Sequence, residues 1–213
     1  MASKRPIWNK GRYSKDSLVS KDEQICISLK CNMRDEFVKR YYKGGGELFE
    51  PYFGHGIINT KVYSTYEFSR HHRCDTVIKS EGCYLGSCEE YIKQHDLRNV
   101  RVADFDHHGI PKGAVELFLT KNKPAELTLF ATYGISCFSR QATVREITVK
   151  KSDSDTKKIR LHYAMRLLPI QYFRELYNEL GYEILQEKTL QFQSLVIYYA
   201  AHIRQRHYSA NRT

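Results

Sequence analysis

Eight cysteine and histidine side chains, all soft or borderline metal ligands, gather in one segment of the chain. They are His71, His72, Cys74, Cys83, Cys88, His95, His107 and His108. Zinc needs four N or S donors, commonly delivered as close pairs with C-x₂₋₄-C spacing. Cys83 and Cys88 have that spacing, and Cys74 or His95 could complete the set. Small half-buried thiols and exposed histidines are the favoured interpretation, because the chain has no C-x₂-C pair.

A second group of potential ligands lies at the end of a predicted strand. Asp104 and Asp106 should face the same side, and with His107 or His108 they could bind Mn²⁺ or Mg²⁺ for phosphoester hydrolysis. The triplet at 106–108 is similar to the signature of DHH phosphoesterases, which implies a metal-dependent phosphoesterase or nuclease. That family also uses an upstream D-x-D segment, which is absent before residue 104. We therefore favour a polar turn and expect no catalysis here.

Other motifs are incomplete. The triple glycine at 44–46 is followed by Glu47, and no Gly-Lys-Ser/Thr exists for a phosphate-binding loop. Cys137 has no histidine that sequence alone can place beside it as a base. No complete catalytic constellation is found, so the sequence predicts a protein that is not an enzyme.

Positive charge is concentrated at the two ends of the chain. The formal net charge is +10, and residues 1–21 hold six basic side chains against one acid. Such flanks indicate a polyanionic partner, either nucleic acid (RNA above all) or an anionic membrane surface. Aromatic side chains such as Trp8 and Tyr13 lie among the cations and could stack on bases. The candidate contact residues are Lys4, Arg5, Lys10, Arg12, Lys15, Lys39, Arg40, Lys43, Arg204 and Arg206.

The totals are those of an ordinary globular protein. The 213 residues are 41% hydrophobic, enough for a packed core. No stretch approaches 18 apolar residues, and the first residues lack the apolar core of a signal peptide. The six cysteines are therefore expected to be reduced, and the protein to be cytoplasmic or nuclear.

Periodicity predicts more strands than helices. Apolar residues alternate at 24–33 and 57–68, and further strands are predicted at 99–105, 114–121, 125–133, 142–150, 158–167, 182–188 and 190–200. The clearest helix is 169–180, with Pro169 at its start and Gly181 after its end. Weaker helices are predicted at 35–42 and 88–95, the latter from a capping box.

The expected fold class is therefore α+β. We predict a mainly antiparallel sheet or sandwich with one clear C-terminal helix and two weaker helices, because the loops between strands are short. Residues 1–22 should be a basic flexible tail, 23–201 a single domain, and 202–213 a basic C-terminal tail.

Two stretches are similar to matrix proteins of the rhabdovirus type. They are Lys112-Gly113-Ala114-Val115-Glu116-Leu117-Phe118-Leu119 and Phe173-Arg174-Glu175, although the P-P-x-Y and P-[TS]-A-P budding motifs of many members are absent. The resemblance implies a structural adaptor, and we predict a non-enzymatic basic protein of the viral matrix or accessory type. It should bind RNA or an anionic membrane, with self-association or a protein partner also open, and without a cofactor. The alternatives are a metal-dependent phosphoesterase or nuclease, and an interaction domain that holds zinc.

Overall fold

Most of the described strands belong to one large sheet. The computed structural model describes residues 21–54, 56–77, 80–107, 111–134, 147–152, 155–159, 161–192 and 196–206. The large sheet contains β1 (Glu47–Glu50), β2 (His71–Asp75), β3 (Tyr84–Leu85), β4 (Val100–Phe105), β5 (Glu126–Gly134), β8 (Tyr182–Phe192) and β9 (Val196–Gln205). A separate pair consists of β6 (Ile147–Ser152) and β7 (Asp155–Ile159).

The strand order of the large sheet is β3-β2-β1-β4-β5-β9-β8. Strands β1 to β5 pair in parallel, whereas β9 is antiparallel to both of its neighbours, β5 and β8. The chain leaves β1 toward β2 and β3 and then returns to the other side of β1 for β4. The order therefore reverses between β1 and β4, which is the point where doubly wound sheets bind their ligands.

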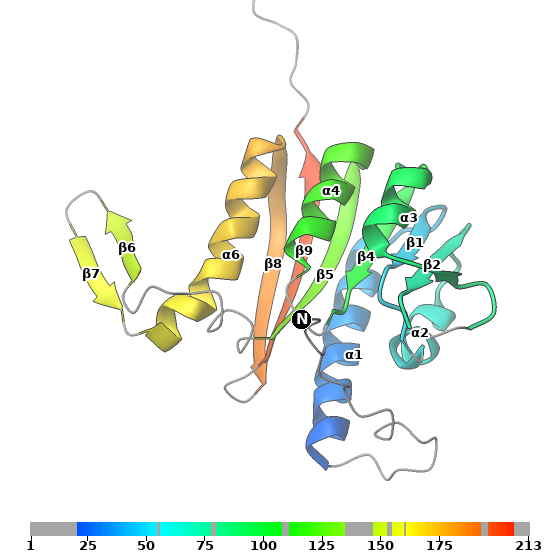
Figure 1. Cartoon of the computed structure of the whole chain (residues 1–213), viewed down its shortest axis with the longest axis horizontal. Coiled ribbons are helices and arrows are strands. Elements are labelled where there is room, and N and C mark those ends of the chain that lie inside the picture. Colours follow the sequence, from blue (N-terminus) through cyan, green and yellow to red (C-terminus); the bar gives the residue numbers. More distant parts are fainter. Residues whose placement is uncertain are drawn as a thin grey trace, which may run out of the picture.

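Helices cover both faces of this sheet (Figure 1). The helices are α1 (Lys21–Tyr41), α2 (Ile57–Lys61), α3 (Cys88–Gln94), α4 (Lys112–Asn122) and α6 (Leu161–Glu179), with a short 3₁₀ turn at Tyr63–Thr65. Buried side chains of α3, α4 and α6 share one core cluster, and those of α1 and the 3₁₀ turn share the other. The strands supply both clusters alternately: Leu48 faces α1, and Phe49 faces α3 and α4.

This architecture corrects the predicted fold class. The sheet is mostly parallel and lies between two helical layers, so the predicted antiparallel sheet or sandwich with one clear helix is wrong. The error came from assigning 114–121 to a strand. That segment is helix α4, and it crosses over between the parallel strands β4 and β5, a connection that a short loop cannot make.

Burial shows why alternation misled the prediction at 24–33. The segment lies in α1, whose fully buried residues Met33, Phe37 and Val38 follow helical spacing, while Ile25 in the alternating set is 50% exposed. In α4 the buried residues Ala114, Val115, Phe118, Leu119 and Asn122 follow the same helical spacing. The predicted strand at 57–68 is likewise α2 and the 3₁₀ turn.

Several elements are confirmed. The capping box Ser87/Glu90 starts α3, and β4 and β5 lie where strands were predicted. Gly181 has a φ of +79° after the last turn of α6, and its N–H bonds the carbonyl of Asn178. However, α6 begins at Leu161, so the strand predicted at 158–167 is wrong over 161–167, and Pro169 lies inside the helix.

The C-terminal segments form the last two strands of the large sheet. Strands were predicted at 182–188 and 190–200. The structure has two strands there with different bounds: β8 runs on to Phe192, and β9 begins at Val196 and extends to Gln205. Among the described residues, no helix combines the length and the apolar character needed to cross a bilayer.

Candidate functional site

A glycine turn follows β1 at the carboxyl edge of the sheet. Gly54 and Gly56 have φ values of +56° and +69°, in the left-handed region that favours glycine. A Cβ on Gly56 would also lie 2.8 Å from the Phe53 ring. Both positions therefore require glycine, and they bring bare backbone to the edge where β1 ends.

Asp75 ends the neighbouring strand β2 and is bonded to this turn. Its Oδ2 accepts a hydrogen bond from the N–H of Gly54 (3.0 Å), and its Oδ1 accepts one from the N–H of Val77 (2.8 Å). The Val77 side chain is 82% exposed. The edge thus presents a carboxylate beside an apolar side chain and glycine backbone.

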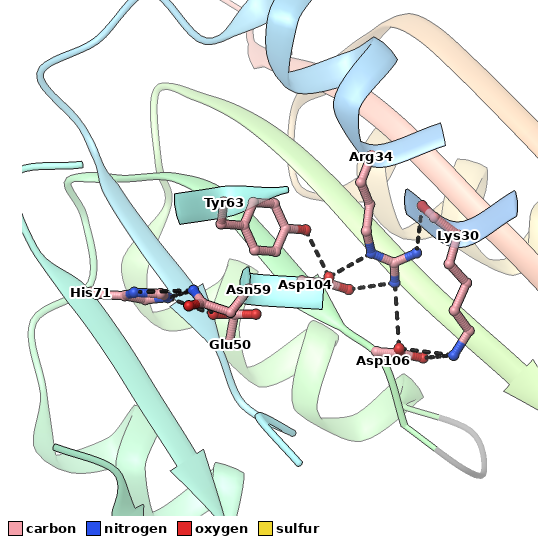
Figure 2. A network of polar contacts seen from close by, with 8 residues as sticks. All are labelled: Lys30, Arg34, Glu50, Asn59, Tyr63, His71, Asp104 and Asp106. Atoms are coloured by element: carbon pink, nitrogen blue, oxygen red, sulfur yellow. Dashed lines mark hydrogen bonds and ion pairs between the residues drawn. The ribbon is translucent and has the colours of Figure 1, made fainter. Parts of the chain in front are cut away.

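A polar layer lies between α2 and the sheet (Figure 2). His71 Nε2 is 2.5 Å from the buried carboxylate of Glu50, and Asn59 on α2 donates to the same oxygen at 3.0 Å. Because Nδ1 of His71 accepts from Arg73 (2.8 Å), its Nε2 carries the proton and donates to Glu50. Burial raises the pKa of Glu50, and the bond from His71 opposes that shift.

The end of β4 holds two carboxylates that α1 pairs with cations. Arg34 binds Asp104 through two nitrogens at 2.6 and 2.8 Å, and the hydroxyl of Tyr63 donates to Asp104 at 2.7 Å. Arg34 and Asp104 are buried, with side-chain exposures of 0% and 2%. The prediction that Asp104 and Asp106 face the same side is confirmed, because Arg34 also lies 3.8 Å from Asp106.

Lys30 and Asp106 form the outer part of this network (Figure 2). Lys30 Nζ is 2.7 Å from Asp106, and the two side chains are 17% and 19% exposed. Burial acts to raise the pKa of Asp106, but the charges of Lys30 and Arg34 outweigh it and hold the pKa at about 2. Asp106 is therefore an ionised hydrogen-bond acceptor at neutral pH and a poor proton acceptor.

Two rings lie where the strand order reverses. Tyr52 follows β1 and His107 follows β4, and their ring centroids are 4.4 Å apart with a 51° angle between the planes. Both side chains are half-buried. The β1–β4 switch point therefore carries an aromatic pair next to Asp106.

The predicted metal ligands come together only in part: Cys74 and Cys88 are hydrogen-bonded neighbours, but Cys83 and His95 do not complete a set around them. Cys74 is buried and donates to the carbonyl of Pro51, Cys83 lies half-buried in the loop before β3, and His95 stacks on Tyr91. Cys88 is buried at the start of α3. Across the part of the chain that the structure describes, no three His, Cys, Asp or Glu side chains are grouped as metal ligands. Asp104 and Asp106, the carboxylates of the phosphoesterase alternative, bind Arg34 and Lys30, and His108 lies outside the described residues.

The predicted polyanion contacts that the structure describes lie at one edge of the sheet. Lys39, Arg40 and Lys43 lie at the end of α1, which leads into the amino end of β1, and Arg204 and Arg206 end β9 beside the amino end of β5. These five residues are thus at the edge opposite the glycine turn. Arg204 pairs with Glu183, Arg206 donates to Asn178, and Arg40 donates to Gln186. Lys4, Arg5, Lys10, Arg12 and Lys15 lie outside the described residues.

The glycine turn and Asp75 were missed by the sequence analysis. A G-x-G turn after a strand, with an acidic residue about 20 positions later, is the fingerprint of dinucleotide-binding sheets. Gly54, Gly56 and Asp75 fit that spacing, with Asn59 in place of the third glycine. The signal was hidden because 57–68 was predicted as a strand, whereas the fingerprint requires a helix there.

Comparisons with known proteins concern the fold. The sequence matches no protein-family model and no curated protein. Among solved structures, M. jannaschii TYW2 in complex with AdoMet (S-adenosylmethionine) has a TM-score of 0.50 at 8% identity, covering 90% of this chain and 80% of that one. A SAM-dependent methyltransferase from Leishmania major has a TM-score of 0.51 at 13% identity, covering 84% and 73%. A structure described as a hemolysin from Streptococcus thermophilus has a TM-score of 0.51 at 10% identity, covering 92% and 69%.

The chain therefore has the Rossmann-like fold of AdoMet-dependent methyltransferases. Its large sheet has seven strands, and β9, next to the edge strand β8, is antiparallel to its neighbours. This finding overturns the prediction of a non-enzymatic structural protein of the viral matrix type. Charged tails and short similar stretches do not distinguish a matrix protein from an enzyme, because neither depends on how the strands are ordered.

Proposed function

We propose that this protein is an AdoMet-dependent methyltransferase. The observation that carries the proposal is Asp75, a carboxylate at the end of β2 that bonds the glycine turn after β1 and lies beside the exposed Val77. The fold of the two methyltransferase structures supports it.

The chemistry of these residues fits the adenosine part of AdoMet. A ribose diol donates hydrogen bonds, and a carboxylate at this position of a doubly wound sheet accepts them. The apolar Val77 suits a face of the adenine ring, and Gly54 and Gly56 let the rest of the molecule approach the backbone closely. AdoMet, when bound, supplies a methyl group on a positively charged sulfur, which an electron-rich acceptor atom attacks.

The buried network around Arg34 gives this edge its rigidity. Arg34 holds Asp104, and Lys30 holds Asp106, so α1 fixes the end of β4 next to the end of β1. Such fixed positions are what a transfer reaction needs, because small misplacements of reacting groups cost large factors in rate.

Calorimetric titration with AdoMet and its product S-adenosylhomocysteine tests the proposal. We expect both to bind, and Asp75→Asn to weaken binding by about 10- to 100-fold, since hydrogen bonds to charged groups contribute about 1.5–3 kcal/mol. Asp96→Asn is the matched control, because Asp96 is exposed and pairs with Arg98 before β4, at the opposite edge.

The side-chain amide that Asp75→Asn introduces can still accept the Gly54 N–H bond through its carbonyl oxygen, but its NH2 group cannot accept the bond from the Val77 N–H. Circular dichroism therefore checks that the variant is folded. The same glycine and aspartate fingerprint occurs in NAD-binding sheets. Titration with NAD⁺ therefore tests whether the site prefers AdoMet or a dinucleotide. A folded protein that binds neither AdoMet nor S-adenosylhomocysteine at millimolar concentration would refute the proposal.

A further inference from the structure

The edge of the sheet opposite the candidate site is rich in basic side chains. Helices α1, α3, α4 and α6 end at this amino edge, and strands β1, β2, β4, β5 and β8 begin there (Figure 1). The segments that meet at the amino edge hold eleven Lys and Arg against six Asp and Glu, over residues 38–47, 66–71, 91–101, 119–126, 176–183 and 203–206. Basic residues thus outnumber acidic ones almost two to one.

Hydrogen bonds to backbone carbonyls join these segments into one continuous strip. The donors and their acceptors are Ser69 and Gly46, Glu47 and Asn99, Arg101 and Glu126, Gln205 and Ala125, and Arg206 and Gly181, at 2.8 to 3.5 Å. Five strand spacings separate β2 from β8, so the strip is about 24 Å long. Cations along it can therefore contact a single extended ligand.

The last turn of α1 reaches both halves of the strip. The ring of Tyr41 stacks on His202 of β9 at 3.9 Å between centroids. The next ring, that of Tyr42, lies 4.5 Å from Phe68, which precedes β2. The exposed cations at the end of α1 are thereby held over the strip.

The unpaired charge of the strip is positive. Four of its six acids are already bonded to a basic side chain or a histidine: Glu47, Asp96, Glu126 and Glu183. By contrast, six exposed cations bond no carboxylate within the described part of the chain: Lys39, Arg40, Lys43, Arg70, Lys123 and Arg206.

Capping of helix ends accounts for only part of this charge. Lys43 donates to the carbonyl of Arg40 at the end of α1, as cations near the last turn of a helix commonly do. Arg70 precedes β2, and its side chain bonds no carbonyl of a helix end among the described residues. The strip therefore carries more positive charge than its helix ends require.

The carboxyl edge, where the candidate site lies, has the opposite character. Glu50 and Asp75 end β1 and β2, Asp106 follows β4, and Glu89 and Glu90 lie in the first turn of α3. Such a separation of charge orients a polyanion toward the amino edge and repels it from the other.

We propose that the amino edge binds the phosphate backbone of a nucleic acid. Guanidinium and ammonium groups bind phosphate oxygens by charge-assisted hydrogen bonds. The inference goes beyond the proposed function and does not depend on it, because the strip and the glycine turn lie at opposite edges of the sheet.

The same strip suits a membrane less well. Surfaces that bind bilayers insert apolar side chains among the lipid headgroups. Of the five large apolar side chains that are exposed in the described part of the chain, Ile25, Ile57, Val77 and Leu85 lie away from the amino edge.

Fluorescence anisotropy with a DNA duplex of about 20 base pairs, measured at several salt concentrations, tests the proposal. We expect Lys39→Gln/Arg70→Gln to weaken binding and to reduce the slope of log K against log salt by about 1.8, since each phosphate contact in a duplex contributes about 0.9. Both side chains are exposed, and neither makes a hydrogen bond or ion pair with the described residues, so the fold should persist. Circular dichroism checks it.

A second double variant tests the other half of the strip. Arg40→Gln/Arg206→Gln removes two cations beside β8 and β9 and should reduce the slope by a similar amount. The matched control is Lys61→Gln/Lys112→Gln, which removes two exposed lysines, one at the end of α2 and one at the start of α4, and should leave the slope unchanged.

The outcomes decide between partners. No binding of the duplex, or equal slopes for the control and both amino-edge variants, would refute the proposal. Tighter binding to vesicles of phosphatidylcholine with about 30% phosphatidylserine than to the duplex would overturn it in favour of a membrane. Lys39→Gln/Arg70→Gln should bind AdoMet as the unaltered protein does. Failure of the unaltered protein to bind AdoMet would therefore refute the proposed function and leave the nucleic-acid interface standing.

Discussion

At the residue scale, the feature with the highest desolvation cost is the buried ion pair between Arg34 and Asp104. Two charges without access to water are tolerated only when each has full hydrogen bonding, and Tyr63 supplies the third bond to Asp104. Desolvation acts to lower the pKa of Arg34, but Asp104 outweighs it, so the pKa rises well above its usual value. Arg34 therefore keeps its positive charge in the folded protein.

Removing one partner should be costly. Arg34→Met leaves Asp104 as an unpaired buried charge, and we expect a loss of about 3–5 kcal/mol in the free energy of unfolding. Urea denaturation measures it. Arg98→Met is the control, because Arg98 and Asp96 are 73% and 61% exposed and should lose less than about 1 kcal/mol. Similar losses in both variants would mean that Arg34 is not buried with Asp104.

At the element scale, helix α6 packs one apolar face against the sheet and leaves the opposite face in solvent. Among the side chains of α6 that the structure describes, the buried ones are Phe173, Leu176 and Tyr177, and the ring of Phe173 stacks on Tyr199 of β9 at 5.2 Å between centroids. The exposed Glu175 lies on the outer face of the same helix. These three buried side chains attach the described part of the helix to the sheet.

Phe173→Ala tests that attachment. The side chain is fully buried, so we expect about 3–5 kcal/mol less stability from lost transfer energy and the cavity left behind. Chemical denaturation measures the change, with Glu175→Ala as the control at less than about 0.5 kcal/mol. A shift below about 1 kcal/mol for Phe173→Ala would show that the ring does not pack on β9.

At the scale of the whole molecule, the last strand completes the sheet. Strand β9 lies between β5 and β8, and its residues Ile197, Tyr199 and Ala201 enter one core while Tyr198 and Ala200 enter the other. The sheet therefore cannot close its core until the C-terminal segment has been synthesised.

We expect a chain that ends after Phe192 to lack cooperative thermal unfolding, because β5 and β8 would lose their shared partner and both cores would lie open. A chain that ends after Arg206 is the control and should melt at the temperature of the full chain. Calorimetry distinguishes the two. A cooperative transition in the shorter chain would mean that β9 is dispensable.

Local features were predictable because they depend on near neighbours in sequence. The capping box at Ser87, the left-handed Gly181 and the shared face of Asp104 and Asp106 all follow from spacing within a few residues, and the structure has each of them. Alternation in 24–33 and 57–68 was no guide, because a short apolar set fits both a strand and a helix until the buried face is known.

The sequence by itself determined the charge of the ends, the caps and several strands of the sheet. Only the tertiary structure decided that β1 to β5 are parallel, and hence that Asp75 meets Gly54 while Lys30 meets Asp106. Strand order and direction depend on contacts between segments far apart in the chain, whose energies no local pattern contains. The same contacts place the described cations at the end of α1 and the end of β9 together at the edge opposite the candidate site.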